Sequence, residues 1–396
     1  MHAPGTLHAD QARPDSSRVF VGRSMTYEGL EPKLQSALDS FPRFCERLRS
    51  ARRVLLKPNV MGLHNPARGR TTHPEFLRAL IVAIRTMTRA EIVVGDGAGP
   101  GVHTPKAFAA TGIADIAGAL GVPVRAFTTA PMSIIEVPNP YLYHQLELAA
   151  ELAEFDVLIN VPKLKTTYAS PAAGMKNLMG LMSQPYRFMF HAHGLHEGVA
   201  DLNTVVVPQL TVVDGILGCE LRWPRKADVF VVGEDPVATD TVCSDVMSIP
   251  TERTPYLKLA SMKGLGQLDR ARIDVVGTPV DEVRTPFKVP PQESPESLST
   301  EMVKVIDCGA CCIGCVGTIQ KGIDDIRRDG LLPRMRKPMT VVIGPNWDPS
   351  QFDQSSTLLI GNCAVGRART WPNVVRGCPP LIHKFSEKLV AVSEQG

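Results

Sequence analysis

Two kinds of segment alternate along the chain between about residues 18 and 278. The first kind is short, apolar and rich in Val, Ile and Leu, and it occurs at residues 52–58, 91–96, 155–162, 211–214, 229–233 and 273–277. The second kind is longer and amphipathic, and it occurs at residues 32–50, 74–88, 104–120, 142–154, 235–247 and 255–263. Unbroken apolar runs bounded by Gly, Pro or Asp are typical of strands buried on both faces. The alternation therefore predicts an α/β fold with a mostly parallel sheet flanked by helices.

The C-terminal quarter has a different pattern. Residues 279–300 hold five Pro and many charges, which predicts a linker. Residues 301–396 predict a smaller Cys-rich α/β domain, with a helix ending near Arg328, strands at 341–344 and 357–361, and a terminal helix from about Leu381. Residues 1–17 are polar and predict a mobile tail. We therefore expect a tail at residues 1–17, an α/β domain at 18–278, a linker at 279–300 and a Cys-rich domain at 301–396.

Charge and hydropathy narrow the class of protein. The 396 residues include 43 Lys and Arg against 40 Asp and Glu, a formal net charge of +3. This balance argues against a general nucleic-acid binder, which needs a large basic surface. No run of roughly 18 apolar residues predicts a membrane span, and the N-terminus lacks the apolar core of a signal peptide. We therefore expect a cytoplasmic protein without nucleic-acid or membrane partners.

The cysteines are unevenly distributed, because six of the nine come after residue 307. In a reducing compartment such a group more often binds metal or does chemistry than forms disulfides. Thiolates favour zinc, copper(I) or iron–sulfur clusters. Gly-Cys-Pro-Pro at residues 377–380 resembles a ligand motif in hydrogenase small subunits and a related respiratory-complex subunit, where it holds a 4Fe–4S cluster.

We expect one iron–sulfur cluster, of the 4Fe–4S type, in the C-terminal domain. The predicted ligands are Cys308, Cys311, Cys363 and Cys378. Cys312 and Cys315 are alternatives to one of them. The same cysteines have three alternative interpretations: structural zinc bound by four thiolates, disulfide bonds, or buried free thiols.

Residues that suit an anionic ligand follow several of the predicted strands. Lys ammonium groups pair with phosphate or carboxylate, helix N-termini bind anions, and ligands of open α/β sheets sit at the carboxyl ends of strands. The predicted substrate-binding residues are Lys57, Asn59, Thr72, His73, Asp96, Lys165, Lys176 and Asn177. Ordinary surface lysines and flexible glycine turns are the structural alternative.

Five further residues are candidates for proton transfer. Imidazoles at the spacing of His191, His193 and His196 can act as acid and base, although His-x-His is not a specific signal. Lys163 and Asp214 each follow or end a predicted strand. We interpret these five as catalytic candidates.

Seven short motifs together resemble the domain-of-unknown-function family 362. They are LLKPN at 55–59, TTHP at 71–74, GDG at 95–97, NVPKLKT at 160–166, GMKNLMG at 174–180, VVDGI at 212–216 and GEDPVATD at 233–240. Members of this family are commonly described as iron–sulfur proteins, many with a ferredoxin-like C-x-x-C-x-x-C-x-x-x-C-P segment. This chain lacks such a segment, so a single cluster in a divergent C-terminal domain is expected.

Taken together, these features predict an iron–sulfur oxidoreductase acting on a small anionic substrate that carries carboxylate or phosphate. A ferredoxin-like electron donor is the expected partner, and a homodimer is compatible with the sequence. Two alternatives remain: a lyase or hydratase that uses the cluster as a Lewis acid, and a non-catalytic cluster carrier.

Overall fold

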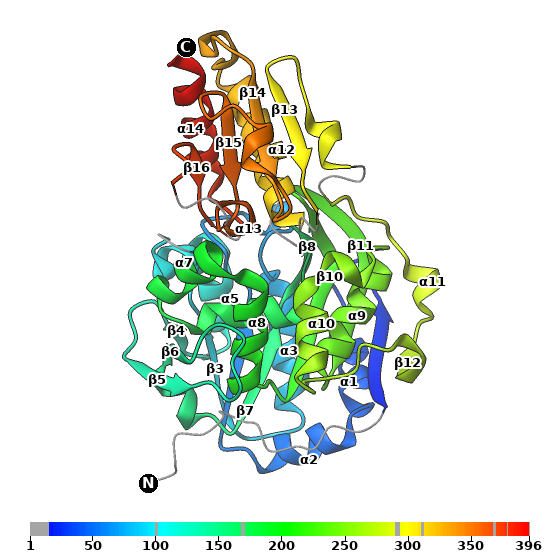
Figure 1. The fold of residues 1–396 in the computed structure, drawn as a ribbon. Helices are drawn as coiled ribbons and strands as arrows, with labels where there is room; N and C mark the ends of the chain where they lie inside the picture. Colours follow the sequence, from blue (N-terminus) through cyan, green and yellow to red (C-terminus); the bar gives the residue numbers. More distant parts are fainter. Residues whose placement is uncertain are drawn as a thin grey trace. The chain divides into compact units, whose positions relative to one another are not determined.

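The computed structural model describes residues 16–99, 102–167, 171–289, 294–309, 313–366, 370–377 and 379–395. The chain divides into two compact units. Unit 1 comprises Met1–Thr166, Pro171–Arg187 and His196–Phe287, and unit 2 comprises Thr167–Ser170, Phe188–Leu195 and Lys288–Gly396. The predicted α/β class is confirmed, since each unit combines a mostly parallel sheet with helices (Figure 1).

Unit 1 is built on one large sheet. Along the sheet its strands are β12 (Ile273–Gly277), β1 (Ser17–Arg23), β11 (Trp223–Gly233), β10 (Leu210–Glu220), β7 (Val157–Val161), β2 (Arg53–Pro58), β3 (Glu91–Asp96) and β4 (Val124–Ala126). β11 is antiparallel to both of its neighbours, and every other pair on this path is parallel. β8 (Lys163–Thr166) also pairs with β10, and β9 (Pro171–Ala172) with β8.

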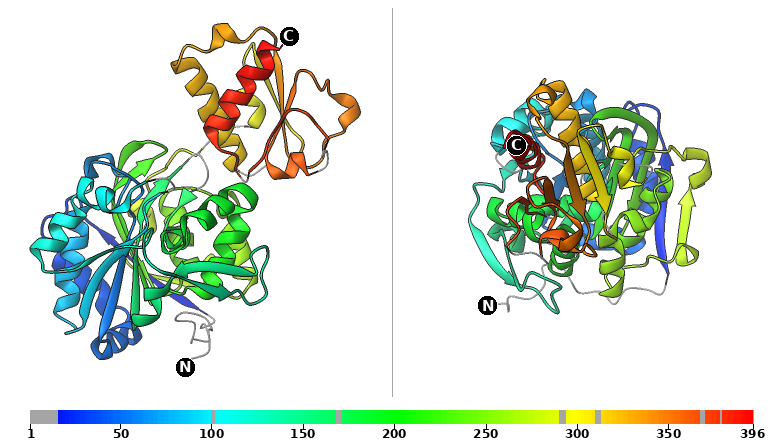
Figure 2. Two further views of the ribbon diagram at one scale, coloured as in Figure 1. Left: turned by 90° about the vertical axis from the view of Figure 1, so that its left-hand side faces the viewer. Right: turned by 45° about the horizontal axis from the view of Figure 1, so that its top comes forward.

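Helices cover both faces of this sheet (Figure 2). They are α1 (Glu31–Asp39), α2 (Pro42–Ser50), α3 (Pro74–Arg85), α4 (Thr104–Ala110), α5 (Ile113–Ala119), α6 (Gly174–Asn177), α8 (Leu195–Val205), α9 (Pro236–Val246), α10 (Pro255–Met262) and α11 (Val280–Val283). α7 (Gln184–His193) spans the division between the units. Val54 and Leu56 of β2 join the apolar faces of α1 to α5 in one core cluster, as the two-residue period of a strand requires.

Two long predicted helices are each interrupted. Residues 32–50 form α1 and α2, because Pro42 begins the second helix and cannot continue the first. Residues 104–120 form α4 and α5, since Gly112 between them adopts a left-handed conformation with φ of 71°. Both breaks are local backbone effects that a hydrophobic pattern does not report.

The predicted helix at residues 142–154 is wrong. This segment contains β6 (Gln145–Ala149), paired antiparallel with β5 (Met132–Glu136), and then a 3-10 turn at Ala150–Glu154. Leu146 and Leu148 are buried and alternate with the more exposed Gln145 and Glu147. The burial of this segment therefore follows the two-residue period of a strand and not the period of a helix.

Unit 2 has its own parallel sheet, in the order β13 (Val303–Asp307), β14 (Met339–Ile343), β15 (Thr357–Ile360) and β16 (Val374–Val375). Its helices are α12 (Ile313–Arg328), α13 (Asn362–Val365) and α14 (Ile382–Glu394). The two predicted strands and two predicted helices of this region are confirmed, whereas β13 and β16 were not predicted. Residues of α12, α14 and the strands form one apolar core.

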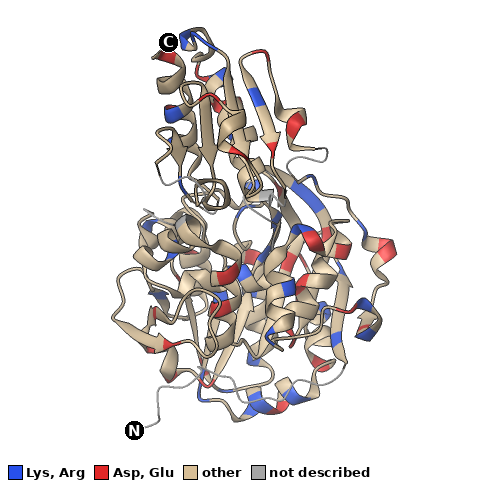
Figure 3. Cartoon of the chain, in the orientation of Figure 1, with Lys and Arg blue, Asp and Glu red and all other residues tan. Residues whose placement is uncertain are grey.

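Basic and acidic segments are interspersed in both units (Figure 3). Within the described residues, no helix is long and apolar enough to span a bilayer.

Candidate functional site

The order of strands in unit 1 reverses between β2 and β7. From β2 the chain moves outward through β3 to β4 on one side, and it then returns to β7 on the other side of β2. Ligands of open α/β sheets bind beyond the carboxyl ends of the strands at such a switch point. Asn59 follows β2, and Lys163 and Lys165 follow β7, so this edge of the sheet carries several of the predicted residues.

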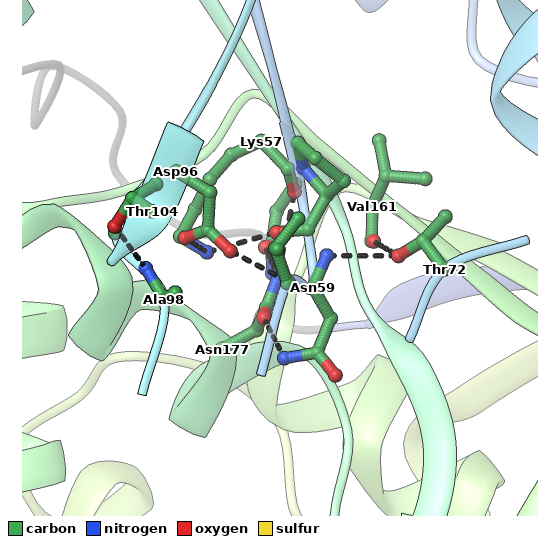
Figure 4. Close-up of polar contacts among 12 residues, drawn as sticks. Lys57, Asn59, Thr72, Asp96, Ala98, Thr104, Val161 and Asn177 are labelled. Carbon is green, nitrogen blue, oxygen red and sulfur yellow. Dashed lines mark hydrogen bonds and ion pairs between the residues drawn. The ribbon is translucent and has the colours of Figure 1, made fainter. Parts of the chain in front are cut away.

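Lys57 and Asp96, at the ends of β2 and β3, form a buried ion pair. Lys57 Nζ lies 2.7 Å from Asp96 Oδ1, and Asp96 Oδ2 accepts a hydrogen bond of 2.7 Å from the Val60 amide (Figure 4). Burial lowers the pKa of Lys57 and raises that of Asp96, while each partner opposes the shift of the other. A side chain on Gly180 would overlap Asp96 Oδ1, so glycine is required there.

Three asparagines link the ends of β2 and β7 to α6. Asn59 Nδ2 donates to Asn177 Oδ1 at 3.0 Å (Figure 4). Asn177 Nδ2 donates to Asn160 Oδ1 at 2.8 Å. Asn160 Nδ2 in turn donates to the Gly174 carbonyl at 2.8 Å. Because these amides satisfy one another, they fix α6 against the carboxyl edge of the sheet.

Thr72 fixes the start of the segment that leads into α3. Its hydroxyl donates to the Val161 carbonyl at 2.7 Å and accepts from the Asn59 amide at 2.8 Å (Figure 4). Thr72 was predicted to bind substrate, and in the structure its hydroxyl joins β7 to the residue that follows β2.

Lys165 is a buried ammonium group with neutral hydrogen-bond acceptors. Its Nζ donates to Asn59 Oδ1 at 2.5 Å and to the Arg70 carbonyl at 3.3 Å. Among the residues that the structure describes, no carboxylate lies within ion-pair distance of Lys165. Burial, together with the charge of nearby Lys176, lowers the pKa of Lys165 to about 7. Burial lowers the pKa of Lys176 to about 8.

Lys163 has a carboxylate partner. Its Nζ lies 2.6 Å from Asp214 Oδ2, and both side chains are 0% exposed. The same carboxylate accepts hydrogen bonds from the Tyr27 hydroxyl at 3.1 Å and from the His73 amide at 2.9 Å. The Tyr27 ring stacks on the His73 imidazole with centroids 3.9 Å apart. The structure thus brings the two predicted catalytic residues together, as a fully enclosed pair that joins β8, β10 and the start of α3.

Asp240 of α9 holds the first turn of α6. Its carboxylate accepts hydrogen bonds from the amides of Gly174 at 2.6 Å and Met175 at 3.1 Å. Burial raises the pKa of Asp240 to about 7. Since α6 carries Lys176, Asp240 positions that ammonium group through the backbone.

The three candidate histidines fall in different units. His191 and His193 belong to the part of α7 assigned to unit 2, and the His193 side chain is exposed. His196 is in unit 1 at the start of α8, where it is 5% exposed and neither ring nitrogen has a hydrogen-bond partner among the residues that the structure describes. The structure therefore does not place the three imidazoles in one unit.

The cysteines of unit 2 follow the carboxyl ends of its strands. Cys308 directly follows β13, and Cys363 lies in α13 after β15. Cys308 is partly exposed and Cys363 is exposed. The predicted ligands Cys311 and Cys378 and the alternative Cys312 lie outside the described residues. Within the described part of the chain, no three His, Cys, Asp or Glu side chains are grouped so as to hold a metal ion.

A glycine with positive φ follows each strand of the unit 2 sheet. These glycines are Gly309, Gly344, Gly361 and Gly377. Cys315 Sγ would lie 2.7 Å from a Cβ placed on Gly361, so this alternative ligand is close to the loop that carries Cys363. The Asn362 amide donates to the Gly377 carbonyl at 3.0 Å, and Gly377 N donates back to Asn362 Oδ1 at 2.9 Å. The loops after β15 and β16 are therefore joined.

Several residues of the site were not predicted from the sequence. Tyr27 and Arg187 lie outside the quoted motifs, and no spacing or composition signal marks them. Asn160 stands in the quoted NVPKLKT segment, and its position at the end of a buried strand is the signal that could have identified it.

Comparisons with known proteins agree with the resemblance drawn from the seven motifs. The Synechocystis sp. protein named Thylakoid-associated protein sll1697 is 27% identical to this chain over 268 residues, which cover 62% of this chain and 79% of that protein. The model of the family described as Domain of unknown function (DUF362) matches residues 54–245, which include the switch point, α6 and Asp240. This part of the chain is therefore similar to the domain-of-unknown-function family 362.

Proposed function

We propose that this protein is an iron–sulfur oxidoreductase that acts on a small substrate carrying carboxylate or phosphate. The observation that carries the substrate class is Lys165, a buried ammonium group at the switch point whose acceptors are the neutral oxygens of Asn59 and Arg70. A buried charge costs free energy unless a counter-charge accompanies it. An anionic ligand would supply that charge.

Lys165 would both bind the substrate and move a proton. Its Nζ can form a charge-assisted hydrogen bond with a carboxylate or phosphate oxygen. With a pKa of about 7, it is present in both protonation states near neutral pH, as a general acid or base requires. Lys176 adds a second positive charge, and the asparagine network orients α6.

The redox part of the proposal rests on the loops of unit 2. Cys308, Cys311, Cys363 and Cys378 would hold the cluster, with Cys312 or Cys315 able to replace one of them. The donor chemistry fits, because thiolates are the usual ligands and loop amides often hydrogen-bond cluster sulfides. Glycines with positive φ beside these cysteines let the backbone approach closely. When bound, such a cluster supplies one-electron transfer.

The cofactor is tested by preparing the full chain without oxygen. Iron and acid-labile sulfide are measured, and the sample is examined by electron paramagnetic resonance before and after reduction with dithionite. We expect a brown protein with iron and sulfide in equal amounts and a signal that changes on reduction. A colourless protein with stoichiometric zinc would contradict the cluster.

The substrate site is tested by calorimetric titration with sulfate at pH 6. We expect Lys165→Met to weaken sulfate binding at least tenfold. Lys106→Met is the matched control, because it removes the same charge from an exposed position on α4. Equal binding by the wild type and both variants would remove the basis for an anionic substrate.

Partners and location follow from the same proposal. We propose a cytoplasmic protein that receives electrons from a ferredoxin-like donor, because cysteines available as metal ligands are typical of a reducing compartment. The Synechocystis relative is named as thylakoid-associated. Cell fractionation followed by immunoblotting separates the two locations. Recovery in the membrane fraction would contradict the proposed cytoplasmic location.

A further inference from the structure

Among the described residues, only one nitrogen of the Arg187 guanidinium group, Nη1, donates hydrogen bonds. Arg187 lies in the first turn of α7, and the residue is 3% exposed. Nη1 donates to the carbonyl oxygens of Gly97, at 3.0 Å, and of Ala98. Nε and Nη2 have no hydrogen-bond partner among the described residues, although both atoms are buried.

Buried polar atoms without partners are rare, because each loses its bonds to water without replacement. Nε and Nη2 lie on the same edge of the planar group, and together they present two parallel N–H donors. That edge matches the spacing of two oxygens on a carboxylate or phosphate. The unpaired atoms of Arg187 thus form a bidentate oxyanion donor.

The backbone around Arg187 is shaped to approach it closely. A Cβ on Gly97 would lie 3.0 Å from Arg187 Nη2 and 2.7 Å from the Gly180 carbonyl. One turn before Arg187, the Ser183 hydroxyl is also buried and has no hydrogen-bond partner in the described part of the chain. Among the described residues, these three polar atoms on consecutive turns therefore lack the acceptors that a bound oxyanion would provide.

The local charge balance favours an anion. Asp96 is the acidic group that acts on Arg187, but its carboxylate is already bound by Lys57 Nζ and by the Val60 amide. The Lys57–Asp96 pair therefore leaves the charge of Arg187 uncompensated. Asp96 also influences Lys165, so both cations belong to one electrostatic neighbourhood at the carboxyl ends of β2 and β3.

We propose that Arg187 binds a carboxylate or phosphate group of the substrate side-on through Nε and Nη2. Arg187 is then the residue that selects substrates with a planar or tetrahedral oxyanion over other anions. This inference rests on the proposed anionic substrate and extends it to a residue outside the sequence motifs. Protein atoms now cover both nitrogens, so the incoming group must displace them.

The direct test observes the Nε–H group of Arg187 by nuclear magnetic resonance in the full chain labelled with ¹⁵N-arginine. The signal is assigned by correlating it with the backbone amide of Arg187 in a sample labelled with ¹³C,¹⁵N-arginine, so the assignment does not depend on a variant. Inorganic phosphate, acetate and chloride are titrated separately at constant ionic strength. We expect a saturable shift with phosphate or with acetate, which tells the two oxyanions apart, and none with chloride, which cannot bridge two donors.

Calorimetry with the anion that shifts the signal supplies the matched comparison. Arg187→Lys should weaken binding at least tenfold, because an ammonium group cannot make the bidentate contact. Arg78→Lys should leave binding unchanged, since Arg78 Nε and Nη2 are already bound by Glu75 at 2.7 Å and Glu31 at 2.6 Å.

The possible results separate this inference from the proposed function. Binding lost in Lys165→Met but retained in Arg187→Lys would overturn the inference and keep the Lys165 site. Binding lost in Arg187→Lys but retained in Lys165→Met would support the inference and remove the Lys165 site. An Arg187 signal that stays unchanged at saturating phosphate and acetate would overturn the inference even if Arg187→Lys does not fold, and would leave Arg187 as a clamp on the loop after β3.

Discussion

Asp214 encloses the charge of Lys163: the carboxylate and the ammonium group are 2.6 Å apart, and neither side chain is exposed to solvent. The Tyr27 hydroxyl and the His73 amide donate two further hydrogen bonds to Asp214. Burial lowers the pKa of Lys163, and the negative charge of Asp214 opposes that shift. Lys163 therefore depends on Asp214 for its ionised state.

Replacing Asp214 with Asn should destabilise unit 1 strongly. The change leaves the Lys163 charge buried without a counter-charge, which typically costs about 3–5 kcal/mol in the free energy of unfolding. The control is Asp274→Asn, whose partner Arg18 lies 2.9 Å away with both side chains 52% exposed. We expect that control to cost less than about 1 kcal/mol. Urea unfolding measures the free energy of unfolding of both variants. Equal losses of stability would contradict the role given to burial.

Sulfate binding should weaken as pH rises from 6 to 9. Lys165 and Lys176 have pKa values lowered to about 7 and about 8, so both are charged at pH 6 and largely neutral at pH 9. An ordinary lysine would keep its charge until about pH 10. Sulfate keeps its own charge over this range, so a change in its affinity comes from titration of the protein.

Calorimetry at several pH values checks this prediction. Bound sulfate favours the charged lysines, so the affinity should begin to fall near the pKa values of the free protein and level off only at the higher pKa values of the complex. In Lys165→Met the decline should be shallower, because one titrating group is gone. An affinity that stays constant to pH 9 would show that neither ammonium group carries the binding.

Two glycine substitutions should have opposite effects on stability. In Gly180→Ala the new methyl group would overlap Asp96 Oδ1 and lie 2.8 Å from Lys57 Nζ, so it must disrupt a buried ion pair. We expect a loss of at least about 3 kcal/mol. In Gly118→Ala the methyl group meets nothing within 4 Å in α5, and the higher helix propensity of Ala should add roughly 0.5–1 kcal/mol. Thermal unfolding of both variants tests these two expectations.

Single Cys→Ser changes should divide the nine cysteines into two groups. We expect iron content to fall in variants of the cluster ligands and to stay unchanged in Cys45→Ser and Cys243→Ser, whose thiols are buried in unit 1. Four required thiolates would agree with electron transfer. Three would favour the lyase or hydratase alternative, because one iron would then keep an open position. Iron loss in none of the variants would contradict the cluster.

Local sequence patterns determined most of the elements. Strands such as β2, β3 and β7 and helices such as α3, α9 and α12 follow from two-residue and 3.6-residue periods, which depend only on neighbouring residues. The same patterns placed Lys57 and Asp96 at the ends of predicted strands and Lys165 just beyond one. These positions are what allowed a polar site to be predicted at the carboxyl edge of the sheet.

Tertiary structure alone decided which of these charges are compensated. Lys163 and Lys165 are two residues apart and look alike in the sequence, yet one faces Asp214 and the other faces the amide of Asn59. Arg187 reaches the loop after β3 across about 90 residues of chain. Such pairings depend on strand order and on long-range distances, and burial then sets the energy of each charge. For this reason the sequence determined where the charged groups stand along the chain, and the folded structure determined which of them lie beside an opposite charge.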